Sequence, residues 1–356
     1  MKIARKVKDL FGLDVKDTAV LEIEDAPPAC TPKLIKQYHF NKDMVKKLML
    51  WIDGIGGHSL ILTGPTGCGK SSLFEQFCSR LGIGLYRVPC HGRLEFQEVI
   101  GSFKLMEEAR EVEANFAGKT PSALLGKWDA LVDAIRRLAG TGPRMIWVDG
   151  PVVRAMREGC VVLLDEFNML HATVFGGLNT ILDGATFMIP ETGEIVEARP
   201  GFRVAMTGNG VDGGADAVLY RGINKVNIAG LDRPCGIRVK YNDWKEDSAI
   251  ILAAHPQMNP SIVEIIVKLA EKVRGMFEKG EMETVISTRK LVQWADLINA
   301  RPWASDSPDD ILQLLKKTLD FALLDVRPPA EQSAIHVMLD AFLRAVPPAA
   351  KKKPTA

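Results

Sequence analysis

The chain lacks the sequence patterns of several common kinds of site. Its six cysteines include no Cys-x-x-Cys pair, which argues against a zinc ribbon or a disulfide framework and predicts free thiols. Its six histidines form no H-E-x-x-H motif, and no G-x-S-x-G elbow is present. No stretch approaches about 18 apolar residues, and charges interrupt the N-terminal stretch before a signal-peptide core can form. We therefore expect a cytoplasmic protein without membrane contact.

A strong charge of one sign is also missing. Lys and Arg number 45 against 44 Asp and Glu, so the net charge is +1 and a nucleic-acid partner is not expected. The densest basic run, at 351–353, lies in a tail rich in Pro and Ala that we expect to be disordered. With 356 residues and 47% hydrophobic content, the composition is that of an ordinary globular protein of about two domains.

One segment matches a phosphate-binding pattern without a mismatch. Residues 64–71 read GPTGCGKS, which fits G-x-x-x-x-G-K-[ST], and they stand between an apolar strand and a helical pattern. The glycines let backbone N–H groups surround an anion, Lys70 can reach the β- and γ-phosphates, and Ser71 can ligate Mg²⁺. The segment predicts binding of ATP or a related triphosphate by Gly64, Pro65, Thr66, Gly67, Cys68, Gly69, Lys70, Ser71 and Ser72.

The arrangement of apolar patterns predicts an α/β fold with a parallel sheet flanked by helices, followed by an all-α domain. The α/β core spans 36–241, with strands at 60–63, 84–88, 161–164, 203–207 and 236–239. Two stretches interrupt it, a charged helical insertion at 107–144 and a β-hairpin at 186–198. Only helical patterns follow, over 242–346, before the tail at 347–356.

The first 35 residues read as a short helix and a linker. Ile3, Val7, Leu10 and Phe11 recur at helical spacing, which predicts an amphipathic helix that packs on its own domain or on a neighbouring subunit. The stretch 26–32 is a linker by its Pro content.

Two further strands end in polar residues. Residues 160–166 read CVVLLDE, an apolar strand that delivers two carboxylates at its carboxyl edge, beside the phosphate loop. Asp165 is predicted to hold Mg²⁺, and Glu166 to orient and polarise the attacking water. The strand 202–209 ends in Asn209, which is predicted to contact the γ-phosphate and that water.

The order of these motifs resembles an AAA+ ATPase, closest to the CobS-like and CbbQ-like branch of the MoxR family. The likeness rests on the P-loop, the Asp165–Glu166 strand end (Walker B), the Asn209 strand and two later arginines, at Leu231-Asp-Arg233 and Ile286-Ser-Thr-Arg289. Further matches are the segments 149–159, 165–168, 178–183 and 198–203, and the hairpin before the Asn209 strand. The resemblance covers about residues 36–300.

The resemblance implies catalytic roles for Lys70, Glu166, Asn209, Arg233 and Arg289. Asn209 matches sensor 1, Arg289 the sensor 2 arginine of a helical lid, and Arg233 the arginine finger that enters the next subunit of a ring. Pro234 departs from the family pattern, and Arg221 is a second candidate for the finger. The aromatic segment 38–40 fits either an adenine contact or plain core.

The resemblance also implies a biological function. Rings of this branch, here expected to be hexameric, hydrolyse ATP with Mg²⁺ to remodel or activate a client protein or metalloenzyme. They commonly do so with a separate von Willebrand A-domain partner. Phe116 and Trp128 in the insertion are candidates for gripping the client, or else pack inside the insertion. The alternatives are the ATPase subunit of a CobS-type metal chelatase, a McrB-like motor linked to nucleic acid, and a scaffold that binds nucleotide without hydrolysis.

Overall fold

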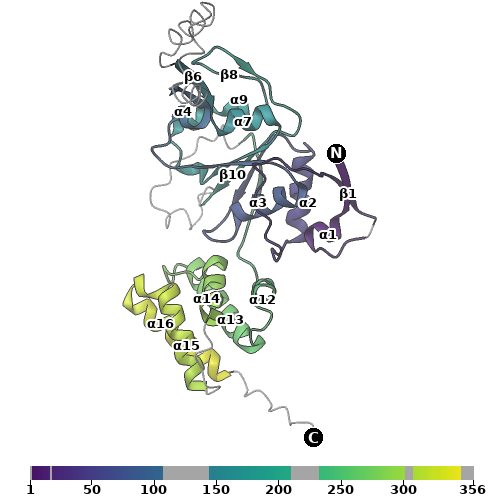
Figure 1. Ribbon diagram of the computed structural model, residues 1–356. Helices are drawn as coiled ribbons and strands as arrows, with labels where there is room; N and C mark the ends of the chain where they lie inside the picture. Colours follow the sequence, from purple (N-terminus) through teal and green to yellow (C-terminus); the bar gives the residue numbers. More distant parts are fainter. Residues whose placement is uncertain (1, 17, 107–143, 210–231, 301–307, 346–356) are drawn as a thin grey trace, which may run out of the picture.

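Five strands form one parallel sheet, as the sequence predicts, and the structure gives their order as β11-β3-β10-β7-β4. The computed structural model describes all residues except 1, 17, 107–143, 210–231, 301–307 and 346–356 (Figure 1). The strands are β3 (Ser59–Thr63), β4 (Leu85–Pro89), β7 (Val161–Asp165), β10 (Arg203–Gly208) and β11 (Cys235–Arg238). Because β10 pairs with both β3 and β7, the P-loop strand, the Asn209 strand and the Asp165 strand end side by side.

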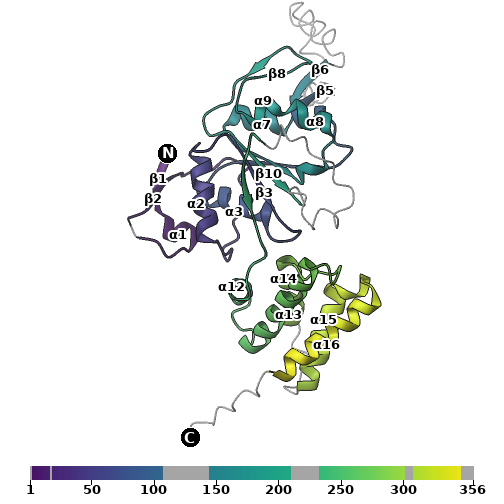
Figure 2. The same ribbon diagram turned by 180° about the vertical axis from the view of Figure 1, so that it is seen from behind.

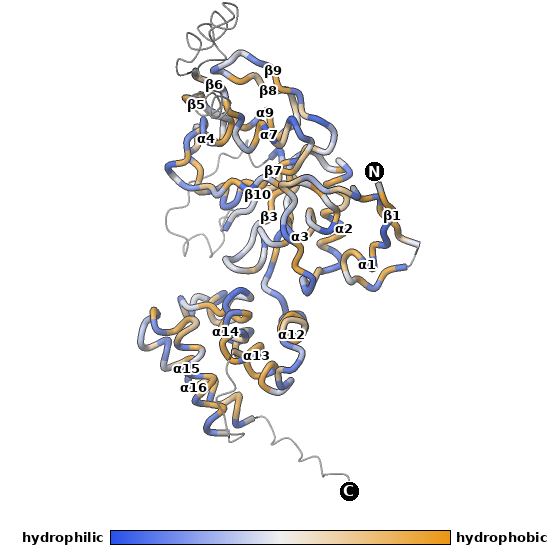
Figure 3. The backbone as a smooth tube through the Cα atoms, viewed as in Figure 1, coloured by the Kyte–Doolittle hydropathy of each residue, from blue (hydrophilic) through white to orange (hydrophobic). Residues whose placement is uncertain are grey.

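Helices cover both faces of the sheet, which explains why its central strands β3, β7 and β10 are mostly apolar. On one face, Leu60 and Leu62 pack with Phe74 and Phe77 under α2 (Lys42–Ile52) and α3 (Lys70–Leu81). The other face lies against α4 (Phe96–Ile100), α7 (Pro151–Glu158), η2 (Phe167–Met169), α8 (Ala172–Gly177) and α9 (Asn179–Leu182). Apolar residues accordingly concentrate along β3, β7 and β10 in the middle of this domain (Figure 3).

The N-terminus corrects one expectation. Residues Lys2–Lys6 form strand β1, and only Val7–Phe11 form a helix, α1. Strand β1 pairs antiparallel with β2 (Val20–Glu24), so that Ala4 lies opposite Glu22 and Arg5 opposite Leu21. The helical prediction failed at Ile3 because its strand partner, Ile23, lies 20 residues away in sequence, and no local pattern reveals that pairing. Phe11 is nevertheless buried, against Phe40 and Phe77.

Two antiparallel pairs project from the core. Strands β5 (Gly101–Met106) and β6 (Arg144–Asp149) pair over their whole length and so bring together the two ends of the expected insertion. The residues between them, including Phe116 and Trp128, lie outside the described part of the chain. Strands β8 (Phe187–Met188) and β9 (Ile195–Val196) pair within the segment where a hairpin is expected.

The C-terminal region is a separate helical domain, drawn below the α/β domain in Figures 1 and 2, and the segment after β11 connects the two. Its helices are α12 (Trp244–Ala254), α13 (Pro260–Glu278), α14 (Thr288–Ala300), α15 (Pro308–Ala322), η3 (Leu324–Val326) and α16 (Pro329–Ala345). Their apolar faces enclose a core around Trp294, Val273 and Ile335, each fully buried. Among the described helices, none is both long and apolar enough to cross a bilayer.

Candidate active site

The phosphate-binding segment forms the turn between β3 and α3. Gly69 is the N-cap of α3 at φ 93°, and no side chain caps that end of the helix. Gly67 has φ 71°, and a Cβ there would lie 2.6 Å from Ser287 Oγ of the helical domain. Only glycine combines this left-handed backbone with so close an approach. The first N–H groups of α3 are thus available to an anion, as a phosphate-binding helix N-terminus requires.

Lys70 is buried in this turn. Its Nζ donates to Gly64 O at 2.9 Å, to Pro65 O at 2.7 Å and to Asn209 Oδ1 at 2.6 Å. Burial lowers the pKa of Lys70, although the negative groups Asp165 and Glu166 counteract part of that effect. The side chain therefore joins the P-loop to the end of β10.

Asp165 sits at the end of β7 within reach of three donors. Its Oδ1 accepts hydrogen bonds from Ser71 Oγ and Thr207 Oγ1, each at 2.5 Å. Its Oδ2 accepts from the guanidinium of Arg87 on β4. Burial alone would raise the pKa of Asp165, but the hydrogen bonds from Ser71, Thr207 and Arg87 outweigh it and hold the pKa below its usual range. The group is therefore a carboxylate in the folded protein at neutral pH.

Glu166 has an unusual backbone. Its φ is 58°, and it is the one non-glycine residue with positive φ in the described part of the chain. Its N–H donates to Thr207 Oγ1 at 3.0 Å, while its side chain is exposed. A left-handed conformation at a residue other than Gly, Asn or Asp is strained, and such strain concentrates at functional sites.

These groups line a single cleft of about 290 Å³, here called the P-loop cleft. It contains six of the seven predicted catalytic and metal-binding residues, with Arg289 contributed by α14 of the helical domain. Its lining residues are Thr66, Gly67, Gly69, Lys70, Ser71, Ser72, Arg87, Pro89, Cys90, Asp165, Glu166, Thr207, Asn209 and Arg289.

The seventh, Arg233, is not among the residues that line this cleft. Its Nε donates to Asp183 Oδ2 at 3.0 Å, and about a third of its side chain is exposed. Arg221, the other candidate for the finger, lies outside the described residues. Within the aromatic segment, core packing is confirmed for Phe40, and an adenine contact stays a prediction. Phe40 is buried in the core, and the Tyr38 hydroxyl lies 4.0 Å from a Cβ placed on Gly69.

Sequence reasoning missed Arg87 and Thr207. Arg87 also donates to Glu75 Oε1 at 2.9 Å, so it links α3 to the end of β7. The available signal was a charge in the middle of the strand Leu85–Pro89, which an all-buried parallel strand would not carry. Thr207 is buried and binds both Asp165 and the Glu166 backbone.

The cleft fits a nucleoside triphosphate with Mg²⁺. The uncapped helix N-terminus, Lys70, Arg87 and Arg289 are donors suited to phosphate oxygens. Ser71 Oγ and the Asp165 carboxylate are hard oxygen donors on one side of it, the kind that Mg²⁺ prefers.

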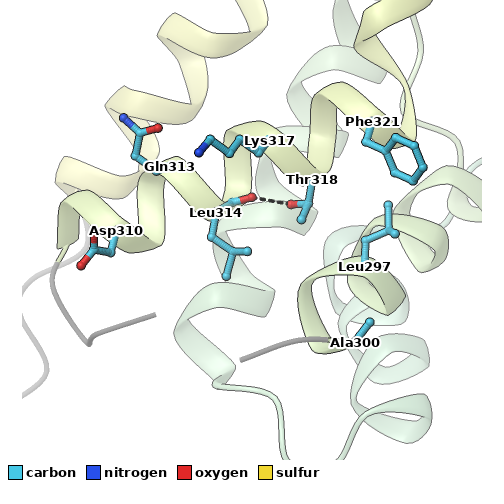
Figure 4. Close-up of a pocket in the computed structure, with 8 residues that line it drawn as sticks. All are labelled: Leu297, Ala300, Asp310, Gln313, Leu314, Lys317, Thr318 and Phe321. Carbon is cyan, nitrogen blue, oxygen red and sulfur yellow. Dashed lines mark hydrogen bonds between the residues drawn. The ribbon is translucent and has the colours of Figure 1, made fainter. Parts of the chain in front are cut away.

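A second hollow, of about 490 Å³, lies in the helical domain between α14 and α15 (Figure 4). It is lined by Leu297, Ala300, Asp310, Gln313, Leu314, Lys317, Thr318 and Phe321. Thr318 Oγ1 donates to Leu314 O and accepts from Trp294 Nε1, so this hydroxyl is already used inside the domain. None of the predicted site residues lines this hollow.

Two family models match the chain in succession. Residues 59–119 and 114–221 match the AAA domain of the dynein-related subfamily, and residues 248–303 match the CbbQ/NirQ/NorQ C-terminal region. The P-loop, the Asp165–Glu166 strand end and the AAA domain define an AAA+ ATPase. Together with the C-terminal match, they show that the chain belongs to the MoxR-like AAA+ ATPases.

Individual proteins are similar over most of their length. An uncharacterized protein of Staphylococcus haemolyticus is 29% identical over 279 residues, which cover 78% of this chain and 88% of that one. One from Staphylococcus aureus is 28% identical over 280 residues, with the same coverage. A crystal structure of a proposed ATPase from Cytophaga hutchinsonii covers 86% of this chain and 89% of its own, at 14% identity and a TM-score of 0.41.

Proposed function

We propose that this chain hydrolyses ATP in the P-loop cleft. The observation that carries the proposal is the convergence of Lys70, Asp165 and Asn209 from the ends of three neighbouring elements on one cleft. Membership of an ATPase family supports the same reaction.

Each residue has a role that its position supports. Lys70 and Arg289 stabilise the negative charge that develops on the transferred phosphoryl group. Glu166, exposed at the cleft, orients the attacking water and draws away its proton, while Asn209 positions that water. Ser71 and Asp165 would hold Mg²⁺, which supplies charge neutralisation of the phosphate oxygens.

We further infer that Arg233 completes the site of a neighbouring subunit. Its pairing with Asp183, away from its own chain's cleft, supports action in trans. An arginine supplied by a neighbour requires a ring, for which we propose a hexamer. The work of that ring is to remodel or activate a client protein or metalloenzyme, with a von Willebrand A-domain protein as partner.

The reaction is tested by ATPase assays on matched variants. Lys70→Ala and Glu166→Gln are expected to lower turnover by at least about 100-fold, because each removes a group acting on the transition state. Lys46→Ala, at an exposed lysine that pairs with Asp43, is the control and should keep full turnover. Undiminished turnover in Lys70→Ala would refute the proposed site.

The client is tested by capture. Glu166→Gln is expected to bind ATP, assemble and stall with its client, whereas Lys70→Ala should not. Proteins retained by Glu166→Gln with ATP and magnesium, and absent with Lys70→Ala, would be clients or partners. A von Willebrand A-domain protein or a metalloenzyme among them supports remodelling. Nucleic acid alone would move the function to a nucleic-acid motor of the same ATPase mechanism.

A further inference from the structure

A cluster of metal-ligating side chains lies at the opposite end of β7 from the P-loop cleft. The Sγ atoms of Cys30 and Cys160 are 3.9 Å apart, although 130 residues separate them in sequence. Glu158 Oε2 lies 3.9 Å from Cys160 Sγ, and one ligand atom from each of the three residues lies within 4.8 Å of the others. Glu158 is exposed, Cys30 is half-buried and Cys160 is buried, so the cluster can be reached from solvent.

The backbone explains how two thiols from distant segments meet. Leu85 N donates to Cys30 O, and Val161 N donates to Gly84 O, so Cys30 and Cys160 flank opposite edges of the β4 strand at Gly84. A Cβ on Gly84 would lie 2.5 Å from Cys30 Sγ and 2.6 Å from Cys160 Sγ. The two thiols therefore meet in the space that a side chain at position 84 would fill, and Gly84 leaves that space free.

This placement disfavours a disulfide. The two sulfur atoms are 3.9 Å apart, whereas a disulfide bond requires about 2.05 Å, so the two side chains would have to move toward each other to form one.

A tetrahedral metal ion requires no such shift. With zinc–sulfur bonds of about 2.3 Å, two thiolates on one ion lie about 3.8 Å apart, close to the separation found here. We propose that Cys30, Cys160 and Glu158 bind a zinc ion, with water completing the tetrahedron. Glu158 supplies the carboxylate oxygen that such sites accept beside sulfur.

Tyr86 supports the site from outside. Its hydroxyl donates to Glu158 Oε2 at 2.8 Å and so fixes the carboxylate that faces the thiols. Such outer partners orient a ligand and typically change metal affinity by about 10- to 100-fold when lost. Tyr86 is a positioning residue here, because its hydroxyl holds the carboxylate of Glu158 in place.

The bound ion would link the segment 26–32, which precedes the ATPase core, to the sheet of that core. Cys30 belongs to the proline-rich stretch 26–32, whereas Glu158 ends α7 and Cys160 precedes β7. A ligand that binds only the folded state raises its stability, so zinc should raise the melting temperature. The P-loop cleft lies at the far end of β7, and nucleotide binding should not depend on the ion.

The test is zinc content of the full chain, produced without a histidine tag in zinc-containing medium and desalted. We expect about one zinc ion per chain. Cys30→Ser and Cys160→Ser should each lose it, Tyr86→Phe should bind it about 10- to 100-fold more weakly, and Cys235→Ser, at an exposed thiol near Gly56, should keep it. Gly84→Ala keeps both thiols but fills their meeting space, and it should also lose zinc.

Cobalt substitution in the wild-type chain provides a second test, and this test does not depend on whether the variants fold. After removal of zinc by a chelator, Co²⁺ should give the wild-type chain a thiolate-to-metal charge-transfer absorption. A wild-type chain with neither zinc nor this absorption overturns the proposal, as does zinc loss in Cys235→Ser. A Cys30–Cys160 disulfide in unreduced peptide maps would overturn it in favour of an oxidised cross-link.

Discussion

At the scale of single residues, Glu166 shows a conflict between local conformation and chemistry. Its left-handed backbone costs about 1 kcal/mol at a residue with a Cβ, yet no glycine or asparagine stands there. The Glu166 N–H is fixed by Thr207, and its side chain is exposed at the cleft. The carboxylate at this position is therefore maintained against a local preference, as expected of a group needed for its chemistry.

Glu166→Asn should be more stable than Glu166→Gln, although both should be inactive. Asparagine tolerates the left-handed conformation, so we expect a gain of about 0.5–1 kcal/mol and a melting temperature about 2 °C higher. The same pair at Glu264, on helix α13, should show the opposite order because glutamine is the better helix former. Equal melting curves for the two Glu166 variants would contradict the strain argument.

Arg87 couples this site to acid stability. Its guanidinium contributes to the depressed pKa of Asp165. A carboxyl group whose pKa is depressed by folding stabilises the protein at pH values above its unfolded pKa. That stabilisation is lost as the pH falls through the folded pKa.

Arg87→Ala should therefore move acid unfolding to higher pH. Without the guanidinium, the pKa of Asp165 rises toward its usual value, and its contribution to stability begins to disappear earlier during acidification. Circular dichroism as a function of pH measures the midpoint, and Arg93→Ala, at an exposed arginine, is the matched control. A midpoint equal to that of wild type would show that Arg87 does not hold the Asp165 charge.

At the scale of elements, apolar patterns along the chain predicted the strands whose formation depends on their own sequence. All five parallel strands, and the strand and helix on either side of the P-loop segment, were confirmed within one or two residues, because buried parallel strands read as continuous apolar runs. The β1–β2 and β5–β6 pairs were not predicted, since antiparallel partners far apart in sequence leave only weak alternation. Arg87 was missed because its partners, Asp165 and Glu75, lie on another strand and on a helix, and a local pattern does not show which elements become neighbours.

The helical domain is fixed by a buried ion pair that the sequence did not reveal. Arg274 Nη1 donates to Asp247 Oδ2 at 2.6 Å, and both side chains are at most 5% exposed. Arg274 Nε also donates to Ile286 O at 2.7 Å, just before the helix that carries Arg289. The pair thus joins α12 and α13 to the start of α14.

Asp247→Ala should destabilise the chain by about 3–5 kcal/mol, because it leaves the Arg274 charge buried without its partner. The measurement is chemical denaturation. Glu264→Ala breaks an exposed pair with Lys268 on α13 and should cost no more than about 0.5 kcal/mol. ATPase activity should fall with Asp247→Ala as well, since Arg289 loses the support of its helix. A loss no larger than that of Glu264→Ala would contradict this account.

At the scale of the whole molecule, the sequence could not show which distant residues meet. The Cys30–Cys160 contact depends on both edges of β4. The absence of a Cys-x-x-Cys pair predicted free thiols, and it could not reveal a site assembled across 130 residues. Arg233 is the reverse case. Its motif predicts a role at the triphosphate, yet its side chain pairs with Asp183, away from its own chain's cleft.

Subunit mixing tests whether Arg233 serves a neighbour. Arg233→Ala keeps an intact cleft, Lys70→Ala keeps an intact Arg233, and each alone should be nearly inactive, since an arginine finger is worth about 10³–10⁵ in rate. In randomly mixed rings, about a quarter of the interfaces combine an intact cleft with an intact Arg233. The mixture should regain about that fraction of activity. Mixing Lys70→Ala with Glu166→Gln, both defective in the cleft, should regain none. Full activity of Arg233→Ala alone would shift the role to Arg221.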